Sequence, residues 1–170
     1  LANPKVMQMA KTAKIGDPMS PDTNIGPVTT APQYKKILDY IDIAKSEGAE
    51  LLTGGGPSDA GAQFVQPTIF TNVDNAMRIA QEEIFGPVLT AMAFDTEEEA
   101  IAMANASPFG LGSGVFTQNV ARAHRVSQRL KAGICWVNTY RAVSPIAPFG
   151  GYDQSGYGRE AGIDAVLDYT

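Results

Sequence analysis

Between residues 88 and 139 the sequence alternates strand-like and helix-like segments, and this pattern constrains the fold more than any other feature. Apolar runs typical of strands alternate with helical periodicity, which gives expected strands over 88–94, 111–117 and 134–139 and expected helices over 96–106 and 119–132. Two consecutive strand–helix–strand units almost always have right-handed crossovers and a parallel sheet. The sequence therefore predicts an α/β fold, a three-layer α/β/α sandwich with a mainly parallel sheet.

The first half of the chain adds helices with clear start and stop signals. Asn3 and Pro4 are typical of an N-cap and a first helical residue. Thr30 begins a capping-box pattern, and Gly48 supplies a C-terminal stop for the same helix. The expected elements are helices over 4–14 and 32–48, a strand over 49–53, an extended segment over 64–70 in which Pro67 marks an edge or an irregularity, and a short helix over 75–81.

Charge and composition exclude several classes of partner. Thirteen basic against 18 acidic residues give a formal net charge of −5, with no run of lysine or arginine that could neutralise phosphates, so we expect no nucleic acid. The apolar runs are strand-sized and far shorter than the ~20 residues that span a bilayer, so we expect no membrane partner. One cysteine, Cys135, and one histidine, His124, argue against a metal site, and an unpaired cysteine fits a reducing, cytoplasmic compartment.

The loop after Thr139 is long and glycine-rich, and it runs to about Gly158. In parallel sheets ligands collect beyond the carboxyl ends of strands, so this loop and those after Phe94 and Thr117 are the expected places for a site. Two glycine clusters are candidates for phosphate loops, and neither fits. Gly110, Gly112 and Gly114 lack the required spacing and precede a strand, and the Gly151–Gly156 segment has Tyr157 where the lysine must stand. Their expected role is to permit tight turns and close backbone approach.

Cys135 lies within the expected strand over 134–139. A thiolate nucleophile needs a base or a helix N-terminus to lower its pKa, and His124 lies on the preceding helix with no Asn or Asp that visibly orients it. A small buried hydrophobe is the simpler interpretation of Cys135.

Two adjacent glutamates, Glu82 and Glu83, precede Phe85, Gly86 and Pro87. A carboxylate followed two residues later by an aromatic, on a loop stiffened by glycine and proline, can accept hydrogen bonds from ribose hydroxyls and offer a flat face to an aromatic ring. Glutamate pairs near a helix end are also common on solvated surfaces. From the residues alone, both interpretations stay open.

Several co-linear motifs together resemble the C-terminal part of the aldehyde dehydrogenase superfamily. They are QEEIFGPV at 81–88, Gly110-Leu111, Phe116-Thr117, Ala132-Gly133, Trp136-Val137-Asn138 and PFGGYDQSGYGRE at 148–160. The similarity in order and spacing covers nearly the whole chain. It implies an NAD- or NADP-dependent enzyme that oxidises an aldehyde to an acid: a cysteine thiolate attacks the carbonyl, hydride passes to the cofactor, and a glutamate-activated water hydrolyses the thioester.

The resemblance also implies roles for particular residues. Glu83 is similar to the family glutamate that holds the nicotinamide ribose, Phe85 to the aromatic beside the nicotinamide ring, and Leu111 to an apolar neighbour of that region. The segment 138–149 resembles the substrate-tunnel loop, in which Val143 and Phe149 would face the side chain of the aldehyde. The groups that read the adenosine ribose lie upstream in the family, so the resemblance leaves NAD and NADP open, and it does not name the aldehyde.

Departures from the family pattern are equally informative. The family's nucleophilic cysteine, general-base glutamate and glycine-bearing cofactor turn all lie upstream of the point that matches Leu1, so the resemblance implies no catalytic residue here and excludes Cys135 as the nucleophile. Asp153 stands where a lysine is usual, which reverses a charge beside the substrate loop. We therefore expect residues 1–170 to be a partial catalytic domain, truncated at both ends and ending before the strand that usually builds the oligomer.

Three hypotheses about function follow. The first is a segment of an aldehyde dehydrogenase that carries nicotinamide-ribose and substrate-loop residues without the nucleophile. The second is a catalytically inactive stand-alone module that packs on a partner or on itself, and the third is a thiol enzyme that uses Cys135. Because a truncated α/β sheet leaves apolar surface uncovered, we expect self-association, or association with the remainder of the enzyme, through parts of 134–149 rather than the polar helix over 96–106.

Overall fold

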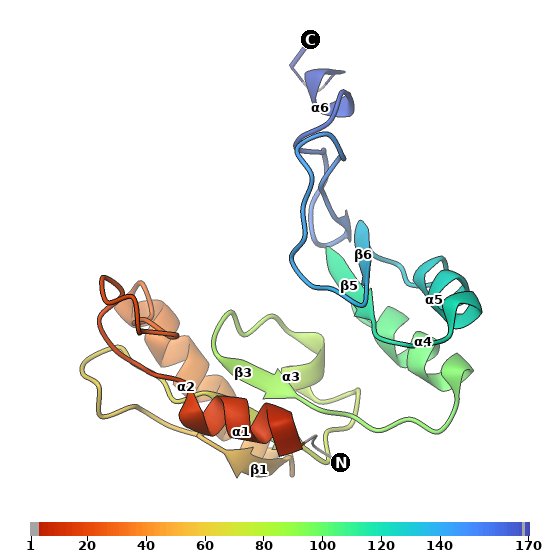
Figure 1. Ribbon diagram of the computed structural model, residues 1–170. Coiled ribbons are helices and arrows are strands. Elements are labelled where there is room, and N and C mark those ends of the chain that lie inside the picture. Colours follow the sequence, from red (N-terminus) through yellow and green to blue (C-terminus); the bar gives the residue numbers. More distant parts are fainter. Residues whose placement is uncertain (1–3, 168) are drawn as a thin grey trace. The chain divides into compact units, whose positions relative to one another are not determined.

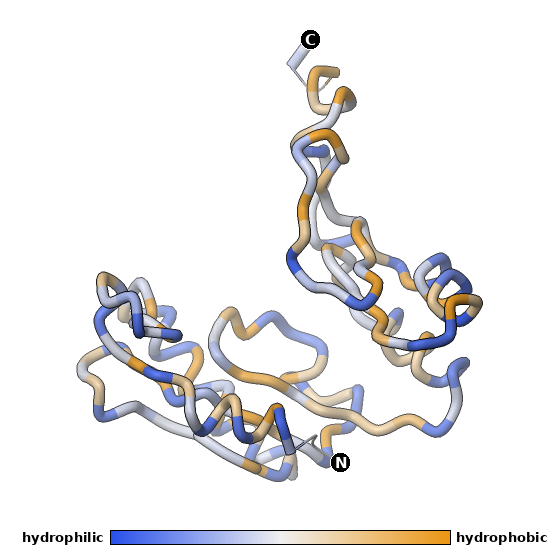
Figure 2. Tube along the Cα trace, in the orientation of Figure 1, coloured by the Kyte–Doolittle hydropathy of each residue, from blue (hydrophilic) through white to orange (hydrophobic). Residues whose placement is uncertain are grey.

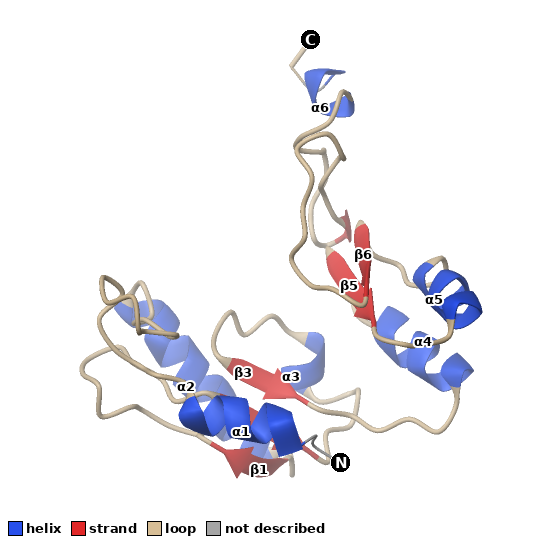
Figure 3. Ribbon diagram, in the orientation of Figure 1, coloured by secondary structure: helices blue, strands red, loops and turns tan. Residues whose placement is uncertain are grey.

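The computed structural model describes residues 4–167 and 169–170. The chain forms two compact units, Leu1–Ala93 and Phe94–Thr170. Each unit contains helices and strands of its own, as Figures 1 and 3 show. The predicted α/β class is therefore found in both units.

The first unit is a three-stranded sheet packed against a long helix, α2. Its elements are α1 (Pro4–Thr12), α2 (Ala31–Ser46), β1 (Glu50–Thr53), β2 (Thr68–Thr71), α3 (Arg78–Gln81) and β3 (Val88–Thr90). Strand β2 is central, because it pairs antiparallel with β1 and parallel with β3. Pro67 thus stands immediately before a central strand, where its missing N–H costs the sheet no ladder bond, and it does not mark an edge.

The core of the first unit lies between α2 and β2. Ile37, Ile41 and Ala44 recur at helical spacing on one face of α2 and are almost completely buried, together with Phe70 of β2. All four residues of β2 are buried. Removing each large apolar side chain from water contributes about 1.5–3 kcal/mol. This core is the rigid base on which the candidate site is built.

Local signals explain where α2 begins and ends. The Thr30 hydroxyl oxygen accepts a hydrogen bond from the Gln33 amide at 3.3 Å, which satisfies one of the free N–H groups of the first turn. Gly48 follows the helix with φ of 93°, a left-handed conformation that glycine adopts without a steric penalty. Asn3, the expected cap of α1, lies outside the described residues.

The second unit is built around one strand–helix–strand unit. Its elements are α4 (Glu97–Asn105), β4 (Phe109–Gly110), β5 (Gly112–Val115), α5 (Val120–Ser127), β6 (Ile134–Val137), β7 (Tyr152–Asp153) and α6 (Asp164–Leu167). Strands β5 and β6 pair in parallel across α5, as predicted, whereas β4 and β7 form a short antiparallel pair. Strand β3 takes β2 as its parallel neighbour, a pairing that the sequence did not predict because periodicity identifies a strand and not its partner.

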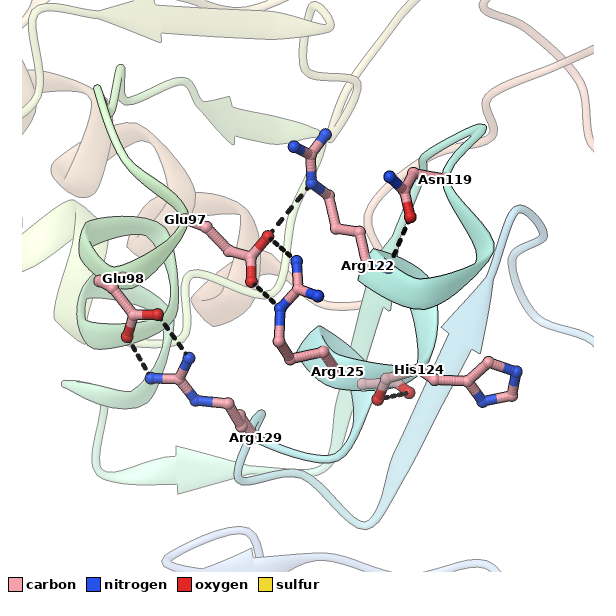
Figure 4. Close-up of polar contacts among 8 residues, drawn as sticks. Glu97, Glu98, Asn119, Arg122, His124, Arg125 and Arg129 are labelled. Carbon is pink, nitrogen blue, oxygen red and sulfur yellow. Dashed lines mark hydrogen bonds and ion pairs between the residues drawn. The ribbon is translucent and has the colours of Figure 1, made fainter.

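Ion pairs join α4 to α5. Figure 4 shows the Glu97 carboxylate between Arg122, at 3.1 Å, and Arg125, at 2.6 Å, while Arg129 binds Glu98. These contacts hold the pKa of Glu97 at about 2, chiefly through the hydrogen bond from Arg125. Both hydrophilic and hydrophobic residues occur along α5 in Figure 2. The two helices are therefore fastened through their polar side chains.

Candidate functional site

The first part of the site is the loop of residues 82–87 between α3 and β3, called the α3–β3 loop below. Along it, Glu83 is exposed, Ile84 is 8% exposed and Phe85 is 74% exposed. The buried Ile84 therefore anchors the loop while its two neighbours face solvent. The two residues that resemble nicotinamide-binding groups are thus accessible from outside.

One face of α2 holds the backbone of this loop. The Gln33 side-chain amide donates to the carbonyl oxygens of Ile84, at 2.8 Å, and Phe85, at 3.1 Å. The Lys36 ammonium donates to the Glu83 carbonyl oxygen at 2.8 Å. Because residues 33 and 36 lie one helical turn apart, both reach the loop from the same side. All three consecutive carbonyl oxygens are satisfied by α2.

Close packing completes the attachment. A Cβ atom at Gly86 would lie 2.6 Å from Cδ1 of the buried Ile37, so only a glycine lets the loop backbone approach the helix this closely. Phe85 itself has φ of 58°, a left-handed conformation that is rare outside glycine. Such a conformation costs on the order of 1–3 kcal/mol and persists only where surrounding contacts enforce it. Here the bonds from α2 supply that enforcement.

The two adjacent glutamates have different environments. The Glu82 carboxylate receives two hydrogen bonds from Arg78, at 2.7 and 2.9 Å, and a third from the Tyr40 hydroxyl. These donors lower the pKa of Glu82 to about 2, with Arg78 as the main cause. Among the described residues, none forms a hydrogen bond or ion pair with the Glu83 carboxylate. Glu83 is therefore the carboxylate that remains available to a ligand.

The other expected site residues belong to the second unit. Leu111 is exposed between β4 and β5, and its carbonyl oxygen accepts from the Ile134 amide at 3.2 Å. Val143 is exposed in the 138–149 segment, and Phe149 is half-buried at its end. The structure thus places Glu83 and Phe85, two of the residues predicted to bind the cofactor, together on one loop, and it places the other three predicted site residues on the second unit.

The segment 138–149 has internal supports. The Trp136 indole N–H donates to the Ala142 carbonyl oxygen at 2.7 Å, and the Tyr140 ring packs edge-on against the indole with centroids 5.3 Å apart. At the far end, Phe149 and Glu160 exchange two backbone hydrogen bonds of 2.7 Å. Both ends of the segment that resembles a substrate loop are therefore held.

The glycine-rich segment that follows packs against the start of β6. A Cβ atom at Gly133 would lie 1.6 Å from the Gly150 carbonyl oxygen, so a glycine is required there. Arg159 donates to the carbonyl oxygens of Gly151, at 3.0 Å, and Gly158, at 2.7 Å. Asp153, the departure from the family lysine, has φ of 51°, a conformation that aspartate tolerates better than most residues.

A surface cavity of about 610 Å³ opens beyond the carboxyl ends of β5 and β6, where the sequence predicts a site. Its lining is mostly apolar and includes Phe116, Val120 and Val137. Asn138 ties the two strand ends together, because its side chain accepts from the Thr117 amide at 2.8 Å and donates to the Thr117 carbonyl oxygen at 2.9 Å.

The thiol and the imidazole show no catalytic arrangement. Cys135 is half-buried on β6, and its only hydrogen-bond contact within the described part of the chain is a weak one of 3.9 Å to the Trp136 carbonyl oxygen. The His124 side chain points away from the ion pairs of α5 in Figure 4. No group of three or more metal-ligating side chains occurs among the described residues. Across residues 4–167 and 169–170, no helix has the length and apolar character needed to cross a membrane.

Sequence reasoning missed four residues around the α3–β3 loop: Gln33, Lys36, Tyr40 and Arg78. A signal was present, since three of them follow helical spacing on α2. Their partners, however, lie 42 to 52 positions further along the chain, so the spacing could not reveal the contacts.

Comparisons with known proteins show the family to which this chain is similar. Residues 3–170 match the model of a family described as the aldehyde dehydrogenase family. Two betaine aldehyde dehydrogenases from strains of Cereibacter sphaeroides are each 48% identical over 166 residues, which is 98% of this chain and 34% of theirs. The chain therefore spans about a third of the length of the curated relatives it matches.

Solved structures show the same likeness. A betaine aldehyde dehydrogenase from Staphylococcus aureus in complex with NAD+ is 42% identical and superposes with a TM-score of 0.93, over 97% of this chain and 34% of its own. A mutant aldehyde dehydrogenase from Bacillus cereus is 44% identical with a TM-score of 0.95, over 98% and 34%. These likenesses confirm the predicted fold class.

Proposed function

The chain belongs to the aldehyde dehydrogenase family, and on that premise we propose that it forms the nicotinamide-ribose and substrate-loop part of an enzyme that oxidises an aldehyde to a carboxylic acid. The observation that carries this proposal is the α3–β3 loop. There α2 binds three successive carbonyl oxygens and leaves an unpaired carboxylate, Glu83, two residues from an exposed ring, Phe85.

These residues fit a nicotinamide dinucleotide. The Glu83 carboxylate can accept hydrogen bonds from both hydroxyls of a ribose, and the Phe85 face can pack beside a nicotinamide ring. From the family resemblance we also propose Leu111 as an apolar cofactor-binding residue. When bound, the dinucleotide supplies the hydride acceptor. The Staphylococcus aureus relative is in complex with NAD+, which supports NAD as the cofactor, and NADP is the alternative.

For the substrate we propose that Val143 and Phe149 face the aldehyde side chain. Both belong to the held segment 138–149, and both are apolar, which favours a hydrophobic pocket wall. The relatives named as betaine aldehyde dehydrogenases support a small cationic aldehyde, next to which aromatic faces are favourable through cation–π attraction. We propose the cytoplasm as the location, where a lone cysteine stays reduced.

We assign no catalytic residue within residues 1–170. Cys135 is half-buried and has no base within hydrogen-bonding distance among the described residues, so the thiolate and the general base of the family reaction come from outside this segment. The purified chain, mixed with NAD+ and an aldehyde, should produce no NADH. Turnover above background would contradict this assignment.

The experiment that tests the cofactor role is a chimaera in which residues 3–170 replace the matching third of the Cereibacter sphaeroides enzyme. We expect the chimaera to oxidise betaine aldehyde with NAD+. Glu83→Gln should raise the KM for NAD+ and slow hydride transfer, because it removes the charge from a ribose acceptor while keeping its shape. Glu50→Gln, at an exposed glutamate of β1, is the matched control. Unchanged kcat and KM in Glu83→Gln would remove Glu83 from the site.

The second candidate function, an inactive interaction module, rests on a different observation. The segment 138–149 carries exposed apolar side chains, among them Ile146, which is 84% exposed. We propose that the face formed by parts of 134–149 packs on a second copy of the chain or on the remainder of the enzyme.

A further inference from the structure

We infer that Tyr40 and Arg78 are positioning residues of the α3–β3 loop, which act through Glu82 to make Glu83 the outward-facing carboxylate. The inference rests on the proposed cofactor role of Glu83. It adds a mechanism for choosing between two adjacent and chemically identical side chains. Hydrogen bonds within the protein occupy the Glu82 carboxylate, so the Glu83 carboxylate remains for the ligand.

The geometry begins at the end of α3. Glu82 is the C-cap of this helix, and its amide donates to the Arg78 carbonyl oxygen at 2.8 Å. Its backbone is extended, with φ of −111° and ψ of 144°. In extended backbone neighbouring side chains point to opposite sides, so fixing the Glu82 side chain against α2 directs Glu83 away from that helix.

Both Glu82 carboxylate oxygens are occupied. The Arg78 guanidinium binds them as a fork, with Nε to Oε1 at 2.7 Å and Nη2 to Oε2 at 2.9 Å, and the Tyr40 hydroxyl also donates to Oε2. A two-point fork determines the orientation of the carboxylate plane as well as its position. A ligand hydroxyl that meets this loop therefore finds both Glu82 oxygens already bound to donors of the protein.

Tyr40, Arg78 and Glu82 together form a clamp, and this clamp is held at both ends by α2. The Arg78 amide donates to the Glu47 carboxylate, at the C-terminus of α2, at 3.0 Å. The Tyr40 ring has the Arg78 guanidinium 5.3 Å from its centroid and the Lys36 ammonium 5.6 Å from it. Since Lys36 also donates to the Glu83 carbonyl oxygen, one continuous network links α2, α3 and the loop.

This network is suited to local order rather than to global stability. The Arg78 and Glu82 side chains are 49% and 40% exposed, so solvent screens their attraction. The core of the unit lies elsewhere, on Ile37, Ile41 and Phe70. Loss of the Tyr40 hydroxyl should therefore loosen the loop and leave the fold intact.

The test uses the full 170-residue chain without any cofactor and follows amide hydrogen exchange residue by residue. In Tyr40→Phe, exchange at the Glu82 and Val88 amides, which lie at the two ends of the loop and donate to the carbonyl oxygens of Arg78 and Gly86, should accelerate about two- to fivefold, the range that corresponds to one exposed polar interaction. Exchange in β2 and the thermal midpoint should stay unchanged. Tyr34→Phe, which changes a tyrosine on the same helix whose hydroxyl binds nothing among the described residues, should have no effect.

Two further variants make the test specific. Glu82→Gln should reproduce the loop effect, and combining it with Tyr40→Phe should add little, because both remove one interaction. Arg78→Lys, which keeps the charge and loses the fork, should show an intermediate effect. The NMR titration midpoint of the Glu82 carboxyl should rise in Tyr40→Phe, because one of the hydrogen bonds that lower its pKa is lost.

The inference is overturned if exchange in the loop is unchanged in Tyr40→Phe and Glu82→Gln, or if β2 and the loop accelerate together, which marks an ordinary structural role. The cofactor proposal fails separately, through unchanged kinetics of Glu83→Gln in the chimaera. A third outcome is that the variants loosen the loop while Glu83→Gln leaves the kinetics of the chimaera unchanged. The network would then order the loop for a purpose other than cofactor binding, which also counts against the inference.

Discussion

The left-handed backbone of Phe85 is the clearest departure from relaxed geometry at the candidate site. An exposed phenylalanine gains little by burial, so its own side chain does not compensate for this conformation. The compensation comes from Gln33, which donates to the carbonyl oxygens of Ile84 and Phe85, one on each side of the Phe85 Cα atom. A strained residue supported by its surroundings, beside an unpaired carboxylate, is typical of a functional loop.

Phe85→Gly tests whether the residue is retained for its ring. Glycine adopts φ of 58° freely, so relief of strain should offset the added chain entropy, and the free energy of unfolding should fall by less than ~0.5 kcal/mol. Phe116→Gly, at a similarly exposed phenylalanine outside the left-handed region, should cost about 0.5–1 kcal/mol. Urea unfolding measures both. A larger loss in Phe85→Gly than in Phe116→Gly would show that the Phe85 ring stabilises the loop.

The response of the loop to acid follows from Glu82. Its pKa in the folded chain is about 2, below the ordinary 4.5, so its stabilising contribution is complete above pH 4.5 and disappears as the pH falls through about 2. We expect the loop to keep its order at pH 4 and to lose it near pH 2. Amide exchange at Glu82 and Val88, at the two ends of the loop, checks this, with Glu82→Gln as the pH-independent reference. Loss of order already between pH 5 and 4 would contradict the assignment.

Helices and strands were predictable wherever a local signal marks their ends. The Thr30 hydroxyl accepts the bond that its capping-box pattern predicts, and α2 begins directly after it. Helix α4 begins at Glu97, one residue after its predicted start. Helix α5 ends at Ser127, five residues before the predicted end, because residues 128–132 form turns instead. The central position of β2 was not predictable, since pairing depends on contacts between distant segments.

The candidate site also has one part that was predictable from neighbouring residues and one part that was not. The Glu83 and Phe85 pair was identified from neighbouring residues in the QEEIFGPV motif, and the structure leaves both exposed. Which of Glu82 and Glu83 remains free was not readable, because the sequence presents them as equals. Their difference comes from Arg78, one helical turn before Glu82, and from Tyr40, 42 positions before it.

Gly133 offers a test of how β6 supports the substrate-type loop. Gly133→Ala places a methyl group 1.6 Å from the Gly150 carbonyl oxygen, where no side-chain rotation can relieve the clash. Overpacking of this kind costs about 1–3 kcal/mol. Gly56→Ala is the matched control, because a Cβ there meets nothing within 4 Å. Differential scanning calorimetry of both variants measures the effect, and the thermal midpoint should fall only in Gly133→Ala. Equal midpoints would show that residues 148–160 do not pack on β6 in solution.

At the scale of the whole molecule, the second unit buries much less of its strands than the first. All of β2 is buried, whereas β5 alternates between exposed and half-buried residues. Parallel strands are normally covered on both faces. The apolar side chains of 138–149, which include Tyr140, Val143 and Ile146, are likewise exposed. This unit has the burial expected of a structure that packs against further protein.

The purified chain should therefore self-associate with rising concentration and bind an apolar dye. Ile146→Ser should weaken the association, because it removes a large exposed apolar group, whereas Ala102→Ser on the exposed side of α4 should not. Sedimentation velocity measures the change. A monomer at all concentrations without dye binding would count against this face as an interface.

The attachment of the α3–β3 loop has a consequence for how such a protein can diverge. Helix α2 grips the loop through main-chain carbonyl oxygens at 83, 84 and 85, which every amino acid possesses. The side chains at 83 and 85 are consequently not needed to attach the loop to α2. Selection, or a designer seeking a different cofactor, could exchange those two residues and inherit an already rigid frame.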